Sequence, residues 1–204
     1  PSSFHDSTVF TTMSYFGPDQ GRGQGDVAWA DWIGADGILY SPQTPMLNDI
    51  YVIQQMYGAS TTTRTDNTVY GFNSTITGTS GQIFDFARNL NPILTIYDSA
   101  GVDTLDLSGW STPSIIDIRP GAFSSANSMT NNIAIARNTN IENARGGSGA
   151  DKIYGNSLGN ILWGGGGDDE IRGLGGADVI YGDSGNDRIF WEAGDATVYG
   201  GSGS

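Results

Sequence analysis

The chain has 204 residues, of which 22 are acidic and 9 are basic, so its formal net charge at pH 7 is −13. This charge argues against nucleic acids and anionic membrane surfaces as partners. The chain has no cysteine, which excludes disulfides, cysteine zinc sites and a cysteine nucleophile. No apolar stretch is long enough to span a membrane, and no signal peptide opens the sequence.

The composition divides the chain into three regions: 1–58, 59–145 and 146–204. The first region is mixed and rich in aromatic residues, and the second is rich in Thr, Asn and Ser with alternating apolar positions. Within the second region, SIIDI at 114–118 and NIAIA at 132–136 are typical of strands. Because the chain starts without an initiator methionine and stops inside a repeat, we expect it to be a fragment at both ends.

The first region contains one clear helix signal. Apolar residues recur there at spacings of four, three and four: Met46, Ile50, Ile53 and Tyr57. This period is typical of an amphipathic helix that packs on a core. Thr44 can cap its start, Pro45 suits its first turn and Gly58 can end it. We expect this helix to be core scaffold without a chemical role.

The third region is a register of nonapeptides that begin at 146, 155, 164, 173, 182 and 191, with a truncated seventh at 200. The pattern G-G-x-G-x-D-x-U-x, in which U is a large apolar residue, is the signature of a calcium-binding parallel β-helix. Glycines at positions 1, 2 and 4 allow unusual backbone angles and a tight turn. The aspartate at position 6 adds a hard oxygen ligand for Ca²⁺. The last three residues form a strand whose middle side chain enters the core: Ile153, Leu162, Ile171, Ile180, Ile189 and Val198.

Two repeats make one coil, so equivalent turns stack every eighteen residues along two edges. The first edge carries aspartate at position 6 of each complete turn: Asp151, Asp169 and Asp187. The second edge is less regular at position 6: Asn160, Asp178 and Ala196. Trp191 also replaces a turn glycine there. We therefore predict strong calcium sites on the first edge, one weaker site between the 155 and 173 turns, and none at the 191 turn.

The predicted calcium ligands of the repeats are the position-6 residues and the turn residues that supply carbonyl or hydroxyl oxygens. They are Gly147, Gly149, Asp151, Asn160, Gly164, Gly165, Gly166, Gly167, Asp169, Gly173, Gly175, Asp178, Gly182, Ser184 and Asp187. Position 9 places three aromatic residues on one sheet: Trp163, Tyr181 and Tyr199. They could form an aromatic ligand platform, but a cross-strand packing ladder is favoured.

Several segments follow one another in the order and spacing of the serralysin group of secreted zinc metalloproteases, which the chain resembles over nearly its whole length. They are MSY at 13–15, SPQTPMLNDIYVIQQMYGA at 41–59, TRTDNTVYGFNS at 63–74 and the nonapeptides. The resemblance implies that residues 1–58 are the C-terminal part of a metzincin catalytic domain. It implies that Met13 forms the Met-turn beneath the zinc, and that Tyr15 is an additional zinc ligand with a catalytic role. It thus implies a mainly β fold, in which a parallel β-roll follows further strands and this remnant with its one helix.

The chain departs from the metzincin pattern in one respect. The zinc motif H-E-x-x-H-x-x-G-x-x-H lies upstream of the Met-turn in that group, and a catalytic zinc needs about three protein ligands. The single histidine here, His5, lies in no such motif and is expected to be an ordinary surface residue. We therefore predict that the isolated chain is inactive, and that it binds Zn²⁺ and a protein or peptide substrate only when the missing half is supplied upstream or by another chain.

Two functions remain open. The first is the C-terminal part of a zinc metalloendopeptidase, which is favoured because TTMSYF at 11–16 is intact. The second is a non-catalytic repeat-in-toxin module for secretion, folding or adhesion. Both imply several bound calcium ions, and the resemblance implies a bacterial, extracellular protein exported by type I secretion. Because metal affinity contributes to folding free energy, chelation should unfold residues 146–204.

The resemblance also nominates calcium ligands ahead of the repeats. A carbonyl-rich segment at 64–68 would bind Ca²⁺ together with a D-x-G-G-x-D segment at 98–103, in which alanine replaces one glycine. The acid just before the first repeat would close the first calcium site of the roll. The nominated residues are Arg64, Asp66, Thr68, Asp98, Ala100, Gly101, Asp103 and Glu142. Without the resemblance, these segments would be a plain Asp/Gly turn and a solvated acid at a strand end.

Overall fold

The computed structural model describes residues 30–203, so His5, Met13 and Tyr15 lie outside the described residues. The elements follow in the order α1 (Leu47–Tyr57), β1 (Val69–Gly71), α2 (Gly78–Phe84), β2 (Leu94–Ile96), β3 (Thr104–Asp106), β4 (Ile115–Asp117), β5 (Phe123–Ser124), β6 (Ile133–Ile135), β7 (Asn143–Arg145), β8 (Lys152–Tyr154), β9 (Ile161–Trp163), β10 (Glu170–Arg172), β11 (Val179–Tyr181), β12 (Arg188–Phe190) and β13 (Thr197–Tyr199). Neither of the helices in this part of the chain is long and apolar enough to cross a membrane.

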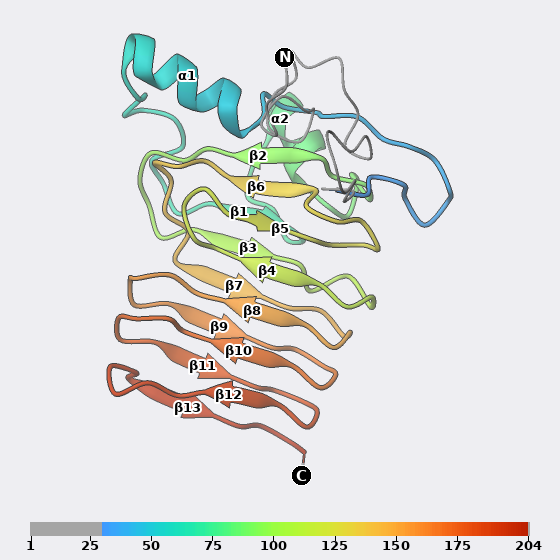
Figure 1. The fold of residues 1–204 in the computed structure, drawn as a ribbon, viewed down its shortest axis with the longest axis vertical. Helices are drawn as coiled ribbons and strands as arrows, with labels where there is room; N and C mark the ends of the chain where they lie inside the picture. Colours follow the sequence, from blue (N-terminus) through green and yellow to red (C-terminus); the bar gives the residue numbers. More distant parts are fainter. Residues whose placement is uncertain (1–29, 204) are drawn as a thin grey trace, which may run out of the picture.

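The strands form a stack of flat coils with the repeats at its C-terminal end (Figure 1). One sheet has the order β1-β3-β7-β9-β11-β13 and a second has the order β12-β10-β8-β4, and every pairing in both is parallel. Within the repeats the register is eighteen residues, because Ile171 lies between Ile153 and Ile189. A third, smaller sheet has the order β2-β6-β5. The prediction of a mainly β, parallel roll is therefore confirmed.

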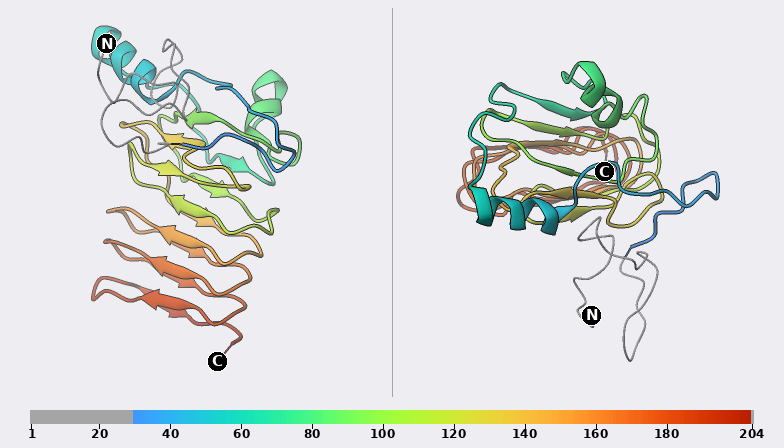
Figure 2. Two further views of the ribbon diagram at one scale, coloured as in Figure 1. Left: turned by 45° about the vertical axis from the view of Figure 1, so that its right-hand side comes forward. Right: turned by 90° about the horizontal axis from the view of Figure 1, so that it is seen from above.

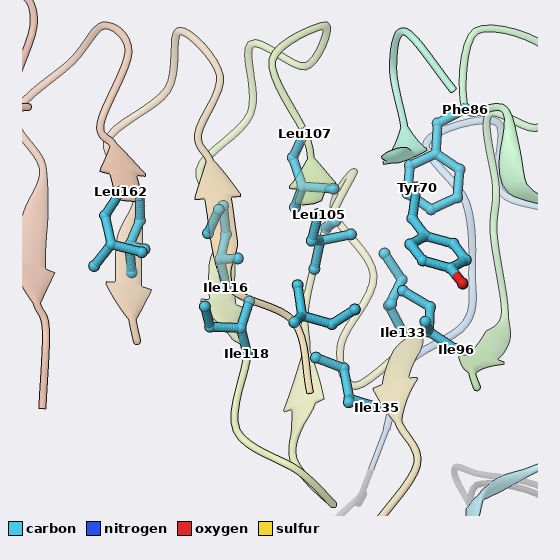
Figure 3. Packing of buried hydrophobic residues seen from close by; sticks show 14 of the residues in the cluster. Tyr70, Phe86, Ile96, Leu105, Leu107, Ile116, Ile118, Ile133, Ile135 and Leu162 are labelled. Atoms are coloured by element: carbon cyan, nitrogen blue, oxygen red, sulfur yellow. The ribbon is translucent and has the colours of Figure 1, made fainter. Parts of the chain in front are cut away.

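The middle residue of each repeat strand points between the two sheets, as the nonapeptide pattern predicts. Ile153, Leu162, Ile171 and Ile180 are fully buried, whereas Ile189 and Val198 in the last coil are only partly buried. The same core continues through the earlier coils, where aromatic and aliphatic side chains from β1, β3 and β4 fill it (Figure 3). Burying these apolar surfaces stabilises a solenoid in which each coil contacts only its neighbours.

The strand region at 59–145 leads into the repeats without a break. SIIDI at 114–118 contains β4 and NIAIA at 132–136 contains β6, so both predicted strands are confirmed. The strand β7 pairs with β3 on one side and with β9 of the repeats on the other. The first sheet is therefore common to both regions.

The helix predicted at 44–58 is present as α1, but its expected role as core scaffold is wrong. It lies outside the sheets, at the end of the stack remote from the repeats (Figure 2). Its start is buried through Met46 and Leu47, whereas Ile53 is 53% exposed and Tyr57 is 80% exposed. Further along the helix, Gln54 is buried and its Oε1 accepts a hydrogen bond from the Asn138 side chain at 3.0 Å, so α1 packs through its start and a polar contact rather than through Ile53 and Tyr57.

The start of α1 also differs from the prediction. The cap is Met46, whose backbone N–H donates to the Asp49 carboxylate at 2.8 Å. The hydroxyl of the predicted cap, Thr44, instead accepts a hydrogen bond from the Thr95 backbone N–H at 2.8 Å, which is a tertiary contact outside the helix. Gly58 ends the helix with φ of 83°, as predicted.

The position-9 aromatic residues form a packing ladder. Their ring centroids lie 5.9 Å apart between Trp163 and Tyr181 and 4.8 Å apart between Tyr181 and Tyr199, with interplanar angles of 7° and 6°. The Arg145 guanidinium covers the other face of Trp163 at 4.7 Å. Because adjacent rings stack face to face, the favoured packing ladder is confirmed and stabilises neighbouring coils, while Tyr199 at its end is 51% exposed.

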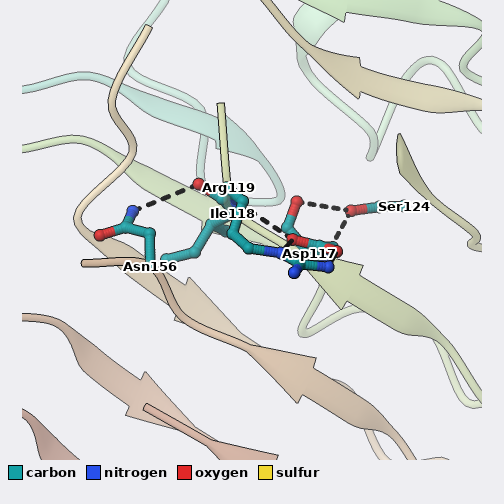
Figure 4. A network of polar contacts seen from close by, with 5 residues as sticks. All are labelled: Asp117, Ile118, Arg119, Ser124 and Asn156. Carbon is teal, nitrogen blue, oxygen red and sulfur yellow. Dashed lines mark hydrogen bonds and ion pairs between the residues drawn. The ribbon is translucent and has the colours of Figure 1, made fainter. Parts of the chain in front are cut away.

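A polar network joins the first repeat coil to the coil before it (Figure 4). The Asn156 side chain is buried and donates to the backbone carbonyls of Ile118 at 3.2 Å and Ile141 at 2.8 Å. Near it, Asp117 pairs with the Arg119 guanidinium, and its backbone N–H donates to Ser124 Oγ. Asn156 stands at a position where the repeat pattern has glycine, and its amide supplies partners for backbone groups that would otherwise be buried without them.

Candidate metal sites

The position-6 carboxylate of each turn folds back over the glycine at position 1. A Cβ on Gly164 would lie 2.5 Å from Asp169 Oδ2, and a Cβ on Gly182 would lie 2.5 Å from Asp187 Oδ2. These glycines do not have positive φ angles, so the sequence interpretation of position 1 was wrong: space, not backbone freedom, requires glycine there. At position 4 the interpretation is confirmed for Gly167, Gly176 and Gly185, which have positive φ, but not for Gly149 and Gly194, which do not.

One oxygen of each position-6 carboxylate is fixed by the preceding turn of the same edge. Asp169 Oδ1 accepts the Asp151 backbone N–H at 2.7 Å, and Asp187 Oδ1 accepts the Asp169 N–H at 3.0 Å. On the other edge, Asp178 Oδ1 accepts the Asn160 N–H at 2.7 Å. These bonds hold each carboxyl group in one orientation, which leaves its second oxygen directed back over its own turn.

Those second oxygens have no partner. Oδ2 of Asp169, Asp178 and Asp187 is buried without a hydrogen bond. A buried acceptor left unpaired costs about 1–3 kcal/mol, and more when it is charged. Burial raises the pKa of Asp169 to about 7, and the Asp151 and Asp187 carboxylates raise it further. Burial likewise raises the pKa of Asp178. A cation in the turns would satisfy these oxygens, so the residues present fit bound Ca²⁺.

Side chains alone do not complete such a site. Across residues 30–203, no group of three or more His, Cys, Asp or Glu side chains is placed to hold a metal ion. Calcium takes six to eight oxygen ligands, and backbone carbonyls serve as well as carboxylates. A calcium ion in these turns must therefore draw most of its ligands from the backbone, which the close approach of stacked glycine turns provides.

The first coil of the repeats differs from the later ones. Both oxygens of Asp151 are paired, because Ser114 N–H donates to Oδ1 at 2.6 Å and Gly147 N–H donates to Oδ2 at 2.8 Å. Asn160 is also satisfied, because it accepts the Asn156 N–H at 2.8 Å and donates to the Glu142 carbonyl at 2.9 Å. Burial still raises the pKa of Asp151. Unpartnered oxygens thus occur on both edges, and the predicted ranking of the edges stays a prediction.

Among the other residues predicted in the repeats, Ser184 connects two turns of the first edge. Its hydroxyl donates to the Gly165 carbonyl at 3.1 Å, and its backbone N–H donates to the same oxygen at 2.9 Å. The Ser184 hydroxyl therefore stabilises the stacking of the 164 and 182 turns.

The structure brings several of the upstream nominees together. Asp103 Oδ1 accepts the Thr68 N–H at 2.8 Å, and the Asp103 N–H donates to Glu142 Oε2 at 2.8 Å. The Asp66 carbonyl lies against Gly101, where a Cβ would be 2.7 Å from it. Asp103 and Glu142, together with residues 98–101, line a cavity of about 90 Å³.

The charges around this cavity are all negative. Burial raises the pKa of Asp103 to about 7, and the Asp98 and Glu142 carboxylates raise it further. Asp98 accepts hydrogen bonds from the Tyr70 hydroxyl at 2.6 Å and the Ala100 N–H at 3.1 Å. The negative charge would favour a cation here, but because the described carboxylates form no metal-binding group of three side chains, backbone oxygens would have to supply the remaining ligands.

Arg64 does not bring its side chain to this cavity. Its Nη1 donates to the Tyr97 carbonyl at 2.6 Å, and its guanidinium lies 4.7 Å from the centroid of the Phe84 ring. Only the backbone of Arg64 remains available for the predicted role.

One buried acid lies outside the nonapeptide pattern and was not predicted. Asp195 stands at position 5 of the 191 turn, and its Oδ1 is buried without a hydrogen-bond partner. Position 6 of that turn is alanine, so the nonapeptide pattern gave no signal. An acid one residue from the expected position is the only sequence feature that points to it.

A protein-family model described as "Peptidase M10 serralysin C terminal" matches residues 59–201. The chain belongs to this family. It is 43% identical over 161 residues to a serralysin of Photorhabdus laumondii, covering 78% of this chain and 30% of that relative. It is 41% identical over 159 residues to a serralysin of Proteus mirabilis, covering 77% and 29%. It is 37% identical over 157 residues to the metalloprotease AprA of Pseudomonas entomophila, covering 77% and 30%.

The chain therefore spans about 30% of the length of the curated relatives that it matches. The serralysin C-terminal match covers both the strand region and the nonapeptides, which share one sheet. The resemblance inferred from the sequence motifs is confirmed, and the chain corresponds to a C-terminal part of serralysin-type metalloproteases.

Proposed function

We propose that this chain is the calcium-binding C-terminal part of a secreted serralysin-type zinc metalloendopeptidase, and that its roll folds when Ca²⁺ binds. One observation carries the proposal: buried, unpartnered carboxylate oxygens recur at position 6 of successive nonapeptides, at Asp169, Asp178 and Asp187. A folded chain that keeps these oxygens ionised without a cation is destabilised by each of them.

Calcium reverses that effect through mass action. An ion that binds the folded roll and not the unfolded chain stabilises the fold by RT ln(1 + [Ca²⁺]/Kd). Extracellular calcium sites have dissociation constants of about 10⁻⁴–10⁻³ M, so such a roll folds outside the cell and stays unfolded where calcium is scarce. The net charge of −13 adds repulsion that the bound ions would reduce. This behaviour suits export of an unfolded chain followed by folding outside the cell.

The protease activity belongs to the complete protein in this proposal. Met13 and Tyr15 would lie beside a zinc ion that activates water for peptide hydrolysis. The three imidazoles and the glutamate of the zinc motif are not in this sequence, so the chain alone is inactive. The alternative is a non-catalytic repeat module. The coding sequence upstream of Pro1 decides between them, because only the protease requires H-E-x-x-H-x-x-G-x-x-H there.

Far-ultraviolet circular dichroism of the chain tests the calcium proposal. In a chelator the β signal of the repeats should be lost, and added Ca²⁺ should restore it cooperatively, whereas Mg²⁺ at the same concentration should restore much less, because Mg²⁺ demands a smaller octahedral site. A spectrum that chelator leaves unchanged contradicts the proposal.

A further inference from the structure

We propose that the 173 and 191 turns bind a calcium ion of their own through Asp178 and Asp195, although position 6 of the 191 turn is Ala196. The inference rests on the proposed calcium function of the roll and adds a site to it. The nonapeptide pattern predicts no site at this turn, because it counts only the acid at position 6.

The backbone of the 191 turn keeps the register of the other turns. The N–H groups of Ala196 and Thr197 donate to the Asp178 carbonyl at 2.8 Å and 3.1 Å. Gly194 stacks on Gly176 at position 4, where a Cβ would lie 2.6 Å from the Gly176 carbonyl oxygen. The 191 turn is therefore in register with the 173 turn, although Gly194 lacks the positive φ of Gly176.

The acid has moved by one position and is held in place by the turn itself. Asp195 Oδ2 accepts the Glu192 backbone N–H at 2.6 Å, and the Asp195 N–H donates to the Glu192 carbonyl at 3.0 Å. These two bonds orient the carboxyl group, and its other oxygen, Oδ1, is buried without a partner.

Asp178 supplies the second half of the site. Its side chain is fully buried, its Oδ1 is held by the Asn160 N–H, and its Oδ2 has no partner. The Asp195 carboxyl group lies within hydrogen-bonding reach of Asp178, and the Glu192 carboxylate adds to the negative field. Each of the two neighbouring carboxyl groups thus keeps one buried oxygen without a hydrogen-bond donor.

Such a pair needs either a cation or a shared proton. On the other edge, where the repeat pattern is intact, Asp169 and Asp187 likewise place two unpartnered carboxylate oxygens on stacked turns. A cation satisfies both oxygens at neutral pH, and its remaining ligands come from the turn backbone and water.

Calcium titration calorimetry on the full chain tests the site, with calcium chloride as the probe. Asp195→Asn should bind one ion fewer than the unchanged chain at neutral pH. Asp168→Asn is the matched control, because Asp168 is also a position-5 acid but is exposed and already accepts the Asn186 N–H at 2.8 Å. It should bind as many ions as the unchanged chain.

A rescue variant guards against a folding defect. Adding Ala196→Asp to Asp195→Asn restores an acid at position 6, so the double variant should recover the lost ion. The inference is overturned if Asp195→Asn binds the same number of ions with the same affinity, which is the result expected of a shared proton. It is also overturned if Ala196→Asp restores nothing in a variant whose β signal is intact. An unchanged chain that binds no calcium at all refutes the proposed function instead.

Discussion

Asp169→Asn separates the two effects that a position-6 carboxylate has on this fold. The asparagine amide keeps an oxygen that can accept the Asp151 N–H, which in the unchanged chain donates to Asp169 Oδ1 at 2.7 Å. It replaces the unpartnered carboxylate oxygen Oδ2 with an uncharged NH₂ group. Without calcium the buried carboxylate opposes folding, because its pKa is raised to about 7 from 3.8. The folded chain then holds the proton more tightly than the unfolded chain, so the stability of the calcium-free fold is greatest below pH 3.8 and is lost as the pH rises towards 7.

The magnitude follows from the two pKa values. The difference between the pKa of about 7 in the folded chain and the ordinary value of 3.8 corresponds to at most about 4 kcal/mol above pH 7, and solvent screening reduces this figure. The asparagine removes this destabilisation, but its buried amide N–H groups then lack acceptors, which destabilises the folded chain by about 1–3 kcal/mol. We therefore expect Asp169→Asn to stabilise the calcium-free roll by about 1–3 kcal/mol. In calcium the variant lacks a charged ligand, and a tenfold loss of affinity alone removes about 1.4 kcal/mol.

The assay is circular dichroism at about pH 8: a titration with the stabilising osmolyte trimethylamine N-oxide in chelator, which measures folding of the calcium-free roll, and urea unfolding in millimolar calcium. The variant should fold at a lower osmolyte midpoint in chelator and unfold at a lower urea midpoint in calcium. Asp168→Asn is the control, because this exposed neighbour should shift both midpoints little. A loss of stability of equal size for Asp169→Asn in both conditions would refute the reasoning, because the carboxylate would then be acting through hydrogen bonds alone.

Two further substitutions test the packing of the repeats. Gly164→Ala places a methyl group 2.5 Å from Asp169 Oδ2, so it should lower the free energy of unfolding in urea by about 1–3 kcal/mol and weaken calcium binding. Gly200→Ala is the control, because a methyl group there has nothing within 4 Å and should have neither effect. Equal effects of the two variants would exclude the close approach at Gly164. Ile171→Ala removes a fully buried side chain and should cost about 2–5 kcal/mol in calcium, with Ile161→Ala, at a position 37% exposed, as the milder control. A cost for Ile171→Ala no larger than that of the control would show that the core is not formed as described.

The repeat architecture could be predicted from the sequence because each nonapeptide determines its own turn and strand. Ile153 and Leu162 occupy the core because period and apolarity agree, and no distant residue is needed to place them. The exposure of Ile53 and Tyr57 on α1 could not be predicted, since amphipathic spacing says which face is apolar but not what covers it. The predicted helix cap was wrong for a similar reason, because the backbone N–H of Thr95, 51 residues away in the sequence, donates to the Thr44 hydroxyl.

The candidate sites were predictable to the same extent. Position 6 singles out Asp169, Asp178 and Asp187, each of which has one buried oxygen without a hydrogen-bond partner, while their role as calcium ligands stays a prediction. The pairing of Asp151 depends on Ser114, which lies 37 residues earlier and belongs to no repeat. The approach of Asp195 to Asp178 depends on how two turns stack. A motif that requires the acid at position 6 cannot predict this contact, because Asp195 stands at position 5.

Crystallography of the chain in calcium, with anomalous scattering to identify the ions, shows directly whether the position-6 carboxylates bind calcium. We expect calcium peaks beside Oδ2 of Asp169, Asp178 and Asp187, each completed by backbone carbonyl oxygens. Ordered water without anomalous signal at these oxygens, in a roll that is fully folded, would contradict this prediction.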